Sequence, residues 1–282
     1  MCDPELEEQE EQQAMRTWSV TTSILITCLV SAVPFASAEP RTEVEPVPGV
    51  LTVQSARDEI TRSVTLTPGA TVRIGSINGP VTIETIAGDT AQIHLIRSAH
   101  SQSELSNGRV EITESSSELS IMGIKNRSNG RSSVTHSLEL RLPRSVSLDI
   151  QGVNGAVDVG EIEGKINLKG INGRVELERA TSSSILSGIN GSVDVTLVQI
   201  SPEGLDVRGI NGGVEIRIID RVDANLKIRG INGSISTELS NLTIQGKVSS
   251  DSLTGIIGSG GPLISVSGVN GRVRIVPAYS GR

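Results

Sequence analysis

The aliphatic residues of this chain recur in a fixed pattern around a tripeptide, Ile/Val-Asn-Gly, which is written seven times. When the copies are aligned on asparagine, an aliphatic residue stands four positions before it and another three positions after it, with polar residues between. Such alternation predicts a β-strand with one buried face on each side of the motif. The seven asparagines are Asn78, Asn154, Asn172, Asn190, Asn211, Asn232 and Asn270.

The spacing of the copies indicates a repeat architecture. From Asn154 onward the steps are 18, 18, 21, 21 and 38 residues, and the last is close to a doubled step. A period of this size indicates one supersecondary unit per copy in a stacked array. Glycine and asparagine tolerate positive φ, so each copy predicts a tight corner. Stacking in register would let the asparagine side chains form a hydrogen-bonded column.

We therefore expect an all-β chain. Residues 147–276 should form a β-solenoid, or parallel β-helix-like stack, of 18–21-residue coils, after a less regular β region at 53–146. Asn-Gly is also typical of two-residue hairpin turns, which would make the repeat an antiparallel meander. The solenoid is favoured because stacking in register gives a reason for identical residues at every corner.

The first 38 residues have the character of a targeting segment. Residues 1–14 carry six acidic residues and no basic one, and we interpret them as a mis-assigned extension before a start at Met15. One basic residue, a short apolar centre and Ala36-Ser37-Ala38 then indicate a secretory signal peptide over residues 15–38, cleaved near Ala38. An uncleaved membrane anchor and a lipoprotein site at Cys28 are alternatives. We expect an exported chain in the periplasm, on the outer surface or in the medium.

Composition narrows the function classes. Both cysteines precede the expected cleavage point, so the exported chain would hold no disulfide or cysteine-ligated metal. Tyr279 would be its one aromatic residue, which removes stacking platforms for bases and sugars. The net charge of -7 falls to about -1 without residues 1–14, which gives no reason to expect nucleic-acid binding. A Pro/Glu-rich linker at 39–52 and a tail at 277–282 complete the domain plan.

Two further segments carry a resemblance to a known family. Thr65-Leu-Thr-Pro-Gly-Ala-Thr-Val-Arg-Ile74 and Leu142-Pro-Arg-Ser-Val-Ser-Leu-Asp-Ile150, followed by serial Gly-Ile-Asn-Gly units, resemble the bacterial putative-adhesin family of unknown function. They are also similar to the head GIN domain of putative autotransporter adhesins. The resemblance covers about residues 60–276. It implies an exported β-solenoid of the cell envelope, and it offers no family catalytic residues to carry over.

Candidate chemistry outside the repeat is sparse. His94, His100 and His136 are not at metal-ligand spacing, and we expect His136 to face outward from its strand. The Gly258-Ser259-Gly260-Gly261 loop lacks the G-x-S-x-G pattern of a nucleophile elbow. We therefore expect no catalytic residue, no metal and no cofactor. A carbohydrate-active β-helix enzyme is the alternative, and it would need carboxylates and a base converging in one groove.

Charged residues in the repeat give one candidate binding surface. In a stack, each set would form a row with a spacing of about 5 Å, so we expect an acidic stripe and a basic stripe on one face. These stripes could form a cation-bridged or polar docking surface for envelope polysaccharide or a surface protein. The favoured alternative is a solvated face that merely follows the alternation. The acidic row, four residues after asparagine, is Asp158, Glu176, Asp194 and Glu215; the basic row is Lys169, Arg208 and Arg229.

The sequence therefore favours an exported, non-enzymatic β-solenoid that acts as a structural or adhesive module of the cell envelope. A self-associating envelope scaffold is a second interpretation, because an open end of a stack exposes unpaired backbone.

Overall fold

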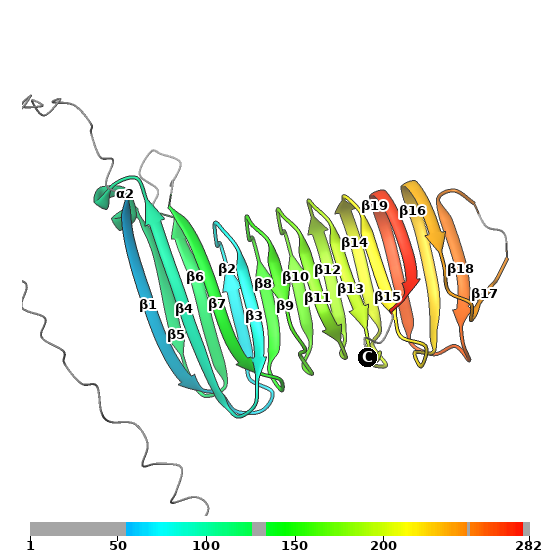
Figure 1. The fold of residues 1–282 in the computed structure, drawn as a ribbon, viewed down its shortest axis with the longest axis horizontal. Coiled ribbons are helices and arrows are strands. Elements are labelled where there is room, and N and C mark those ends of the chain that lie inside the picture. The colour runs from blue at the N-terminus through cyan, green and yellow to red at the C-terminus, as the bar shows by residue number, and fades with distance from the viewer. Residues whose placement is uncertain (1–54, 126–133, 247–248, 279–282) are drawn as a thin grey trace, which may run out of the picture. The chain divides into compact units, whose positions relative to one another are not determined.

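The computed structural model describes residues 55–125, 134–246 and 249–278. These ranges form an all-β structure in which nineteen strands belong to one large sheet that folds back on itself (Figure 1). The all-β prediction is confirmed. The expected extension, signal peptide and linker lie outside the described residues, as does most of the tail.

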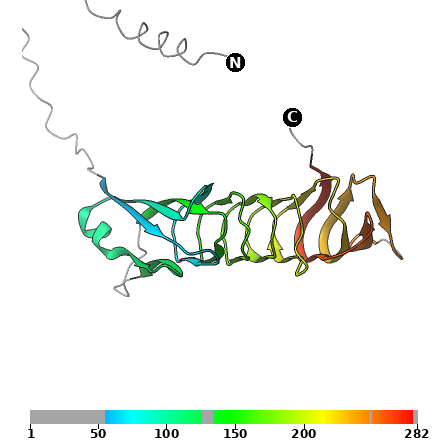
Figure 2. The same cartoon turned by 90° about the horizontal axis from the view of Figure 1, so that it is seen from below.

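The strands of the repeat alternate between two layers, which we name layer A and layer B (Figure 2). Equivalent strands of successive copies pair in parallel and in register, for example Leu168 with Leu186 in layer A and Val175 with Val193 in layer B. The strands that flank an Asn-Gly therefore pair with their counterparts in the next copy. Layer A holds β8 (Ser147–Gln151), β10 (Ile166–Lys169), β12 (Ser184–Ile189) and β14 (Leu205–Asn211); layer B holds β9 (Val157–Val159), β11 (Val175–Ala180), β13 (Val193–Leu197) and β15 (Val214–Ile218).

The first copy of the motif lies in the same stack although 76 residues separate it from the second. Its strands pair in parallel with β8 and β9 on one side and with one further strand of each layer on the other. Beyond those, strands that pair antiparallel complete the N-terminal end of both layers. Layer A continues through β2 (Thr71–Gly75), β6 (Glu118–Lys125) and β5 (Gly108–Glu114); layer B continues through β3 (Val81–Ile86), β7 (Thr135–Pro143), β4 (Thr90–Ala99) and β1 (Ala56–Thr65).

Among the described residues, one short helix interrupts the strands. It is α2 (Gln102–Asn107), and the Ser101 side chain caps it by accepting a hydrogen bond from the backbone N–H of Glu104. The sequence analysis missed it because six residues are too few to show a helical period. Within the described ranges, no helix has the length and apolar character needed to span a membrane.

The last two copies stack in reversed chain order. The long strand β19 (Leu263–Pro277) lies between β14 and β15 on one side and β16 (Ala224–Thr237) on the other, in parallel with all three. On the far side of β16, β18 (Ser252–Ile257) pairs antiparallel with its first half, and β17 (Leu242–Ile244) follows. The chain thus passes over one place in the stack and fills it on its return, which explains the 38-residue step.

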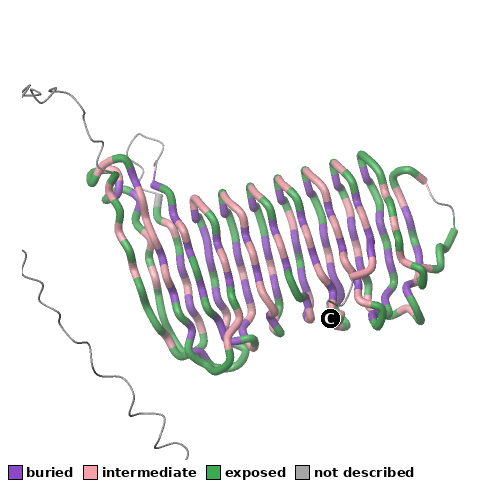
Figure 3. Tube along the Cα trace, viewed as in Figure 1, coloured by how far each residue is buried: buried purple, intermediate pink, exposed green. Residues whose placement is uncertain are grey.

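One aliphatic core runs through both layers. The residue three positions after each asparagine is at most 2 % exposed in six of the seven copies. Figure 3 shows such buried positions recurring along the strands. Valine, isoleucine and leucine fill this core without aromatic residues, because β-branched side chains suit a pleated and buried surface. The six residues are Val81, Val157, Val175, Val193, Val214 and Val273.

The seven asparagine side chains form a continuous hydrogen-bonded ladder along one corner. Each Nδ2 donates to the Oδ1 of the previous asparagine, with N···O distances of 2.7 to 3.1 Å. At one end Asn78 Nδ2 donates instead to the carbonyl oxygen of Val134 at 2.8 Å. The order along the ladder is Asn78, Asn154, Asn172, Asn190, Asn211, Asn270 and Asn232.

The two glycines of the motif serve different purposes. The glycine two residues before asparagine has φ between +61° and +65°, which is the left-handed region that glycine adopts at low cost. The glycine after asparagine lies against the next corner: a Cβ on Gly173 would sit 2.3 Å from the carbonyl oxygen of Gly155. The first copy of the motif has Ser76 in place of the glycine two residues before asparagine, and Ser76 has a φ of 56°.

We expect the contact between stacked corners to tolerate no side chain. Gly173→Ala should lower the free energy of unfolding by about 3 kcal/mol, because backbone must move to admit the methyl group. Gly213→Ala is the matched control: its Cβ would meet the nearest atom at 3.7 Å, so it should be neutral or slightly stabilising. Urea denaturation of both variants measures the difference, and equal losses would contradict the steric explanation.

Candidate functional site

The acidic row predicted from the sequence is brought together on the outer side of layer B. Asp158 lies beside Glu176 across β9 and β11, Glu176 beside Asp194, and Asp194 beside Glu215 in the parallel register. Neighbouring carboxylates in such a row repel each other unless cations lie between them. The structure therefore has to supply compensation within this face.

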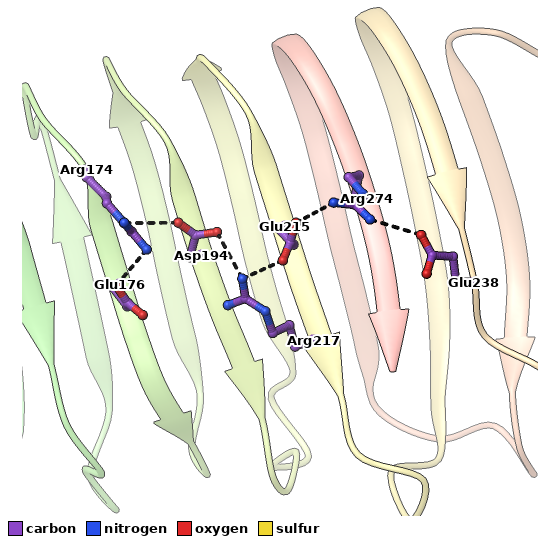
Figure 4. Close-up of polar contacts among 7 residues, drawn as sticks. All are labelled: Arg174, Glu176, Asp194, Glu215, Arg217, Glu238 and Arg274. Atoms are coloured by element: carbon purple, nitrogen blue, oxygen red, sulfur yellow. Dashed lines mark hydrogen bonds and ion pairs between the residues drawn. The ribbon is translucent and has the colours of Figure 1, made fainter. Parts of the chain in front are cut away.

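Three arginines supply that compensation, and the alternating charges form one network (Figure 4). Arg174 contacts Glu176 at 2.8 Å and Asp194 at 3.2 Å, both measured from guanidinium nitrogen to carboxylate oxygen. Arg217 bridges Asp194 at 3.8 Å and Glu215 at 2.5 Å. Arg274 then links Glu215 at 3.1 Å to Glu238 at 3.0 Å. We name these seven residues the layer-B network.

The network is partly shielded from solvent. The side chain of Asp194 is 15 % exposed and that of Glu215 is 21 % exposed, whereas the guanidinium-bearing side chains are 36 to 52 % exposed. Water therefore screens the arginines more than it screens Asp194 and Glu215. The pKa of Arg274 is raised, first by its hydrogen bond to Glu238 and then by the charge of Glu215. The guanidinium group of Arg274 therefore stays charged and holds Glu215 and Glu238 in fixed positions.

The acidic row lacks a neighbouring cation at its N-terminal end. Asp158 makes no ion pair or hydrogen bond to any residue in the described ranges, and Ala156 occupies the position equivalent to Arg174. Glu84 pairs with Arg141 at 2.9 Å farther along the same layer. The carboxylate of Asp158 thus faces the surface without an internal cation.

The basic row lies on the other layer. Lys169 is on β10, Arg208 on β14 and Arg229 on β16, and serines separate them in the pairing register. Arg208 pairs with Asp206 of its own strand at 3.1 Å. Lys169 lines a surface hollow of about 420 Å³ together with Arg73. The structure therefore does not bring the predicted acidic and basic rows onto one set of strands.

A second hollow, of about 480 Å³, lies on layer B where β4 and β7 meet β3. His94 stands in its lining, with Nε2 at 2.8 Å from Glu59 and Nδ1 at 3.3 Å from Glu139. These hydrogen bonds, the Glu59 one first, raise the pKa of His94 because both favour the charged imidazolium. The hollow is thus lined by charges that pair with one another.

His136 corrects an expectation of the sequence analysis, because it is buried and does not face outward. Its side chain lies in the N-terminal end of the core at 7 % exposure, and Nδ1 accepts a hydrogen bond from the backbone N–H of Asn78 at 3.1 Å. Burial, followed by the positive charge of Arg97, lowers the pKa of His136. The ring therefore serves as a neutral acceptor that fixes the first corner.

No metal-binding group of side chains lies within the described ranges. They hold no group of three histidine, cysteine, aspartate or glutamate residues placed to bind a metal ion. The backbone N–H of Ser259 donates to Asp223 at 2.9 Å, so that loop is held by a structural contact. The described surface does carry fixed charges that pair with one another.

The acidic row expected from the sequence includes three carboxylates of the network, but Glu238 and the three arginines were not expected. Arg174, Arg217 and Arg274 stand two, six and four residues after their asparagines, so they share no position in the repeat. They converge only because a guanidinium group reaches across about one strand spacing, from whichever outward position it occupies. Alignment of the copies by position could not reveal this.

Comparison with solved structures finds chains that align with this one at low TM-score and low identity. A putative cell adhesion protein from Clostridium sporogenes aligns with a TM-score of 0.44 and 11 % identity, over 79 % of this chain and all of that one. A putative adhesin from Bacteroides fragilis has a TM-score of 0.32 and 11 % identity, over 77 % and 97 % of the two chains. A putative lipid binding protein from Parabacteroides distasonis has a TM-score of 0.27 and 12 % identity, over 78 % and 97 %.

No protein-family model matches the chain. No curated protein matches it significantly. The similarity to the solved structures is too low for their names to inform the function of this chain.

We expect the layer-B network to stabilise the fold through Arg217. Arg217→Met should lower the free energy of unfolding by about 1 kcal/mol, because it leaves Asp194 and Glu215 as adjacent, partly shielded carboxylates. Arg141→Met is the control, since Arg141 and Glu84 are 59 % and 61 % exposed and such pairs contribute about 0.5 kcal/mol or less. Chemical denaturation at low and high salt measures both, and equal effects would contradict the shielding argument.

His94 should make stability depend on pH. Because its folded pKa is raised, its stabilising contribution is fully present below the unfolded pKa of about 6.5 and is lost as pH rises through the folded value. The difference in unfolding free energy between the wild type and His94→Gln should therefore be larger at about pH 5.5 than at about pH 8.5. His100→Gln is the control. A His94→Gln difference that does not vary with pH would contradict this assignment.

Proposed function

We propose that this chain is an exported, non-enzymatic β-solenoid that acts as a structural or adhesive module of the cell envelope. The parallel, in-register pairing of equivalent strands supports a solenoid, because it places every copy of the repeat at the same corner. The signal peptide that the sequence predicts at residues 15–38 supports the location. The observation on which the proposal mainly rests is the row of fixed charges on layer B.

This row suits docking along a surface better than catalysis. Catalysis of hydrolysis or elimination needs an acid and a base that approach one substrate atom within hydrogen-bonding distance. In the layer-B network, each arginine is engaged by two carboxylates, and the charges are spread along the stack. An extended polar polymer or a flat protein surface can contact many such positions at once. Asp158 and the other carboxylates favour a partner that carries positive charge or hydroxyl groups.

Binding of the full-length chain to insoluble envelope polysaccharide purified from the host tests this proposal. Neutralising layer B with Asp158→Asn and Glu176→Gln should weaken co-sedimentation by about tenfold, and added salt should weaken binding of the wild type. The matched control removes two charges from layer A with Lys169→Gln and Arg208→Gln, and it should bind like the wild type.

Two outcomes would contradict the proposal. Equal binding by the layer-B and layer-A variants would mean that the carboxylate row is not the docking surface. Shortening of the polysaccharide during incubation would identify a carbohydrate-active enzyme instead. Fractionation of the host tests the location separately, and a strictly cytoplasmic chain would contradict the export signal.

A further inference from the structure

Two copies of the motif have the same local sequence but different surroundings. The segments Gly188-Ile-Asn-Gly-Ser192 and Gly230-Ile-Asn-Gly-Ser234 are identical over five residues. Asn190 lies in the middle of the asparagine ladder, whereas Asn232 is its last member. A difference in reactivity between these two asparagines would therefore come from the structure and not from their immediate neighbours in the sequence.

The Asn190 side chain is held at both of its polar atoms. Its Nδ2 donates to Oδ1 of Asn172 at 2.9 Å, and its Oδ1 accepts from Nδ2 of Asn211 at 2.9 Å. Asn232 Nδ2 donates to Asn270 Oδ1 at 3.0 Å, but no described residue donates to Asn232 Oδ1. The carboxamide of Asn232 is therefore fixed by one hydrogen bond, whereas that of Asn190 is fixed by two.

The glycine that follows the asparagine differs between the two copies in the same way. The N–H of Gly191 donates to the carbonyl oxygen of Asn211 at 3.1 Å, so it is directed at the next copy in the stack. No copy follows β16 among the described residues, so the N–H of Gly233 lacks an equivalent acceptor there. Gly233 is also exposed, whereas the glycines after the other six asparagines are partly buried.

The strand that carries Asn232 is covered on both sides only in its first half. That half pairs with β18 as well as with β19, and the N–H of Ile231 donates to the carbonyl oxygen of Asp251 at 3.2 Å. From Asn232 to Thr237, β16 pairs with β19 and with no other described strand. A segment that is paired on one side opens locally at a lower free-energy cost than one paired on both sides. The backbone at Asn232 can therefore rotate more readily than the backbone at Asn190.

We propose that Asn232 is a site of spontaneous deamidation, a reaction that the other six copies of the motif resist. Asparagine is chemically labile, and a following glycine places no side chain beside the attacking nitrogen. The backbone nitrogen of Gly233 loses its proton to hydroxide and attacks Cγ of Asn232, which forms a cyclic succinimide. The Cγ–Nδ2 bond breaks, and Nδ2 takes a proton from water and leaves as ammonia. Water then opens the ring at either carbonyl carbon and yields aspartate or isoaspartate.

This reaction changes the C-terminal end of the stack. An ionised carboxylate has no N–H to donate, so the last hydrogen bond of the ladder, from residue 232 to Asn270, is lost. Isoaspartate also lengthens the backbone, which shifts the following residues relative to β19. Glu238 lies in that segment and pairs with Arg274 at 3.0 Å, at the end of the layer-B network. The modification is argued from the edge of β16 and does not depend on what layer B binds.

Peptide mapping by mass spectrometry tests this site in the full-length chain, incubated folded at mildly alkaline pH. The peptide with Asn232 should gain the mass of deamidation at least about tenfold faster than the peptide with Asn190, because Asn190 reacts only after an interior strand opens. Chromatography should separate its product into aspartate and isoaspartate forms. The same chain unfolded in guanidinium chloride is the matched control, and there the two identical segments should react at equal rates.

Hydrogen exchange tests the structural cause independently. In the folded chain the backbone amide of Gly233 should exchange faster than that of Gly191, because only the latter has an acceptor in the next copy. Equal deamidation of Asn190 and Asn232 in the folded chain would overturn the proposal, since the edge would then not control the reaction. An Asn232 that stays unmodified while the unfolded control reacts, or a Gly233 amide as protected as that of Gly191, would overturn it as well.

Discussion

The structure depends on how closely successive corners approach each other. Parallel strands fix the spacing between copies at about 4.8 Å, and at that spacing the backbone of one corner touches the backbone of the next. Glycine after each asparagine is the only residue that leaves this contact possible, as the position of Gly173 against Gly155 shows. The asparagine beside it then meets its counterpart at hydrogen-bonding distance. Buried aliphatic rows and fixed charges on the outer faces are further results of the same spacing.

Much of this arrangement follows from the sequence because it is periodic. Positions that repeat in the chain repeat in space, so the buried row through Val157 and Val175 and the acidic row through Glu176 and Asp194 could be anticipated from an alignment of the copies. What could not be anticipated depends on contacts that break the period. His136 is buried because it closes the first corner, in a part of the chain where alternation alone suggested an outward side chain. The arginines of the layer-B network could not be anticipated either, because they meet in space although they occupy unrelated positions in the repeat.

The order of the last two copies shows another limit of the repeat. Asn232 precedes Asn270 in the chain, but Asn270 is the neighbour of Asn211 in the ladder. A spacing of 21 residues between Asn211 and Asn232 suggests adjacency, whereas the structure separates them by one strand. The period of the sequence predicts well which residues form one copy of the repeat. It predicts which copies are neighbours in the stack only where consecutive copies in the chain also stack next to each other.

This return of the chain places its final described strand inside the stack, with paired neighbours on both sides. A chain that emerges from a ribosome or a translocation pore N-terminus first can add the early copies of the repeat to the stack one after another. The last two copies of this chain cannot be added in that order. β16 can pair with β19, its final neighbour, only after β19 has emerged. β19 is therefore an interior strand of the stack. A chain cut before residue 263 would lack this interior strand, and the loss would not be limited to a dispensable end. Folding of the C-terminal half is therefore coupled to synthesis of β19, and a chain interrupted before this strand would expose unpaired strands on which cellular quality control can act.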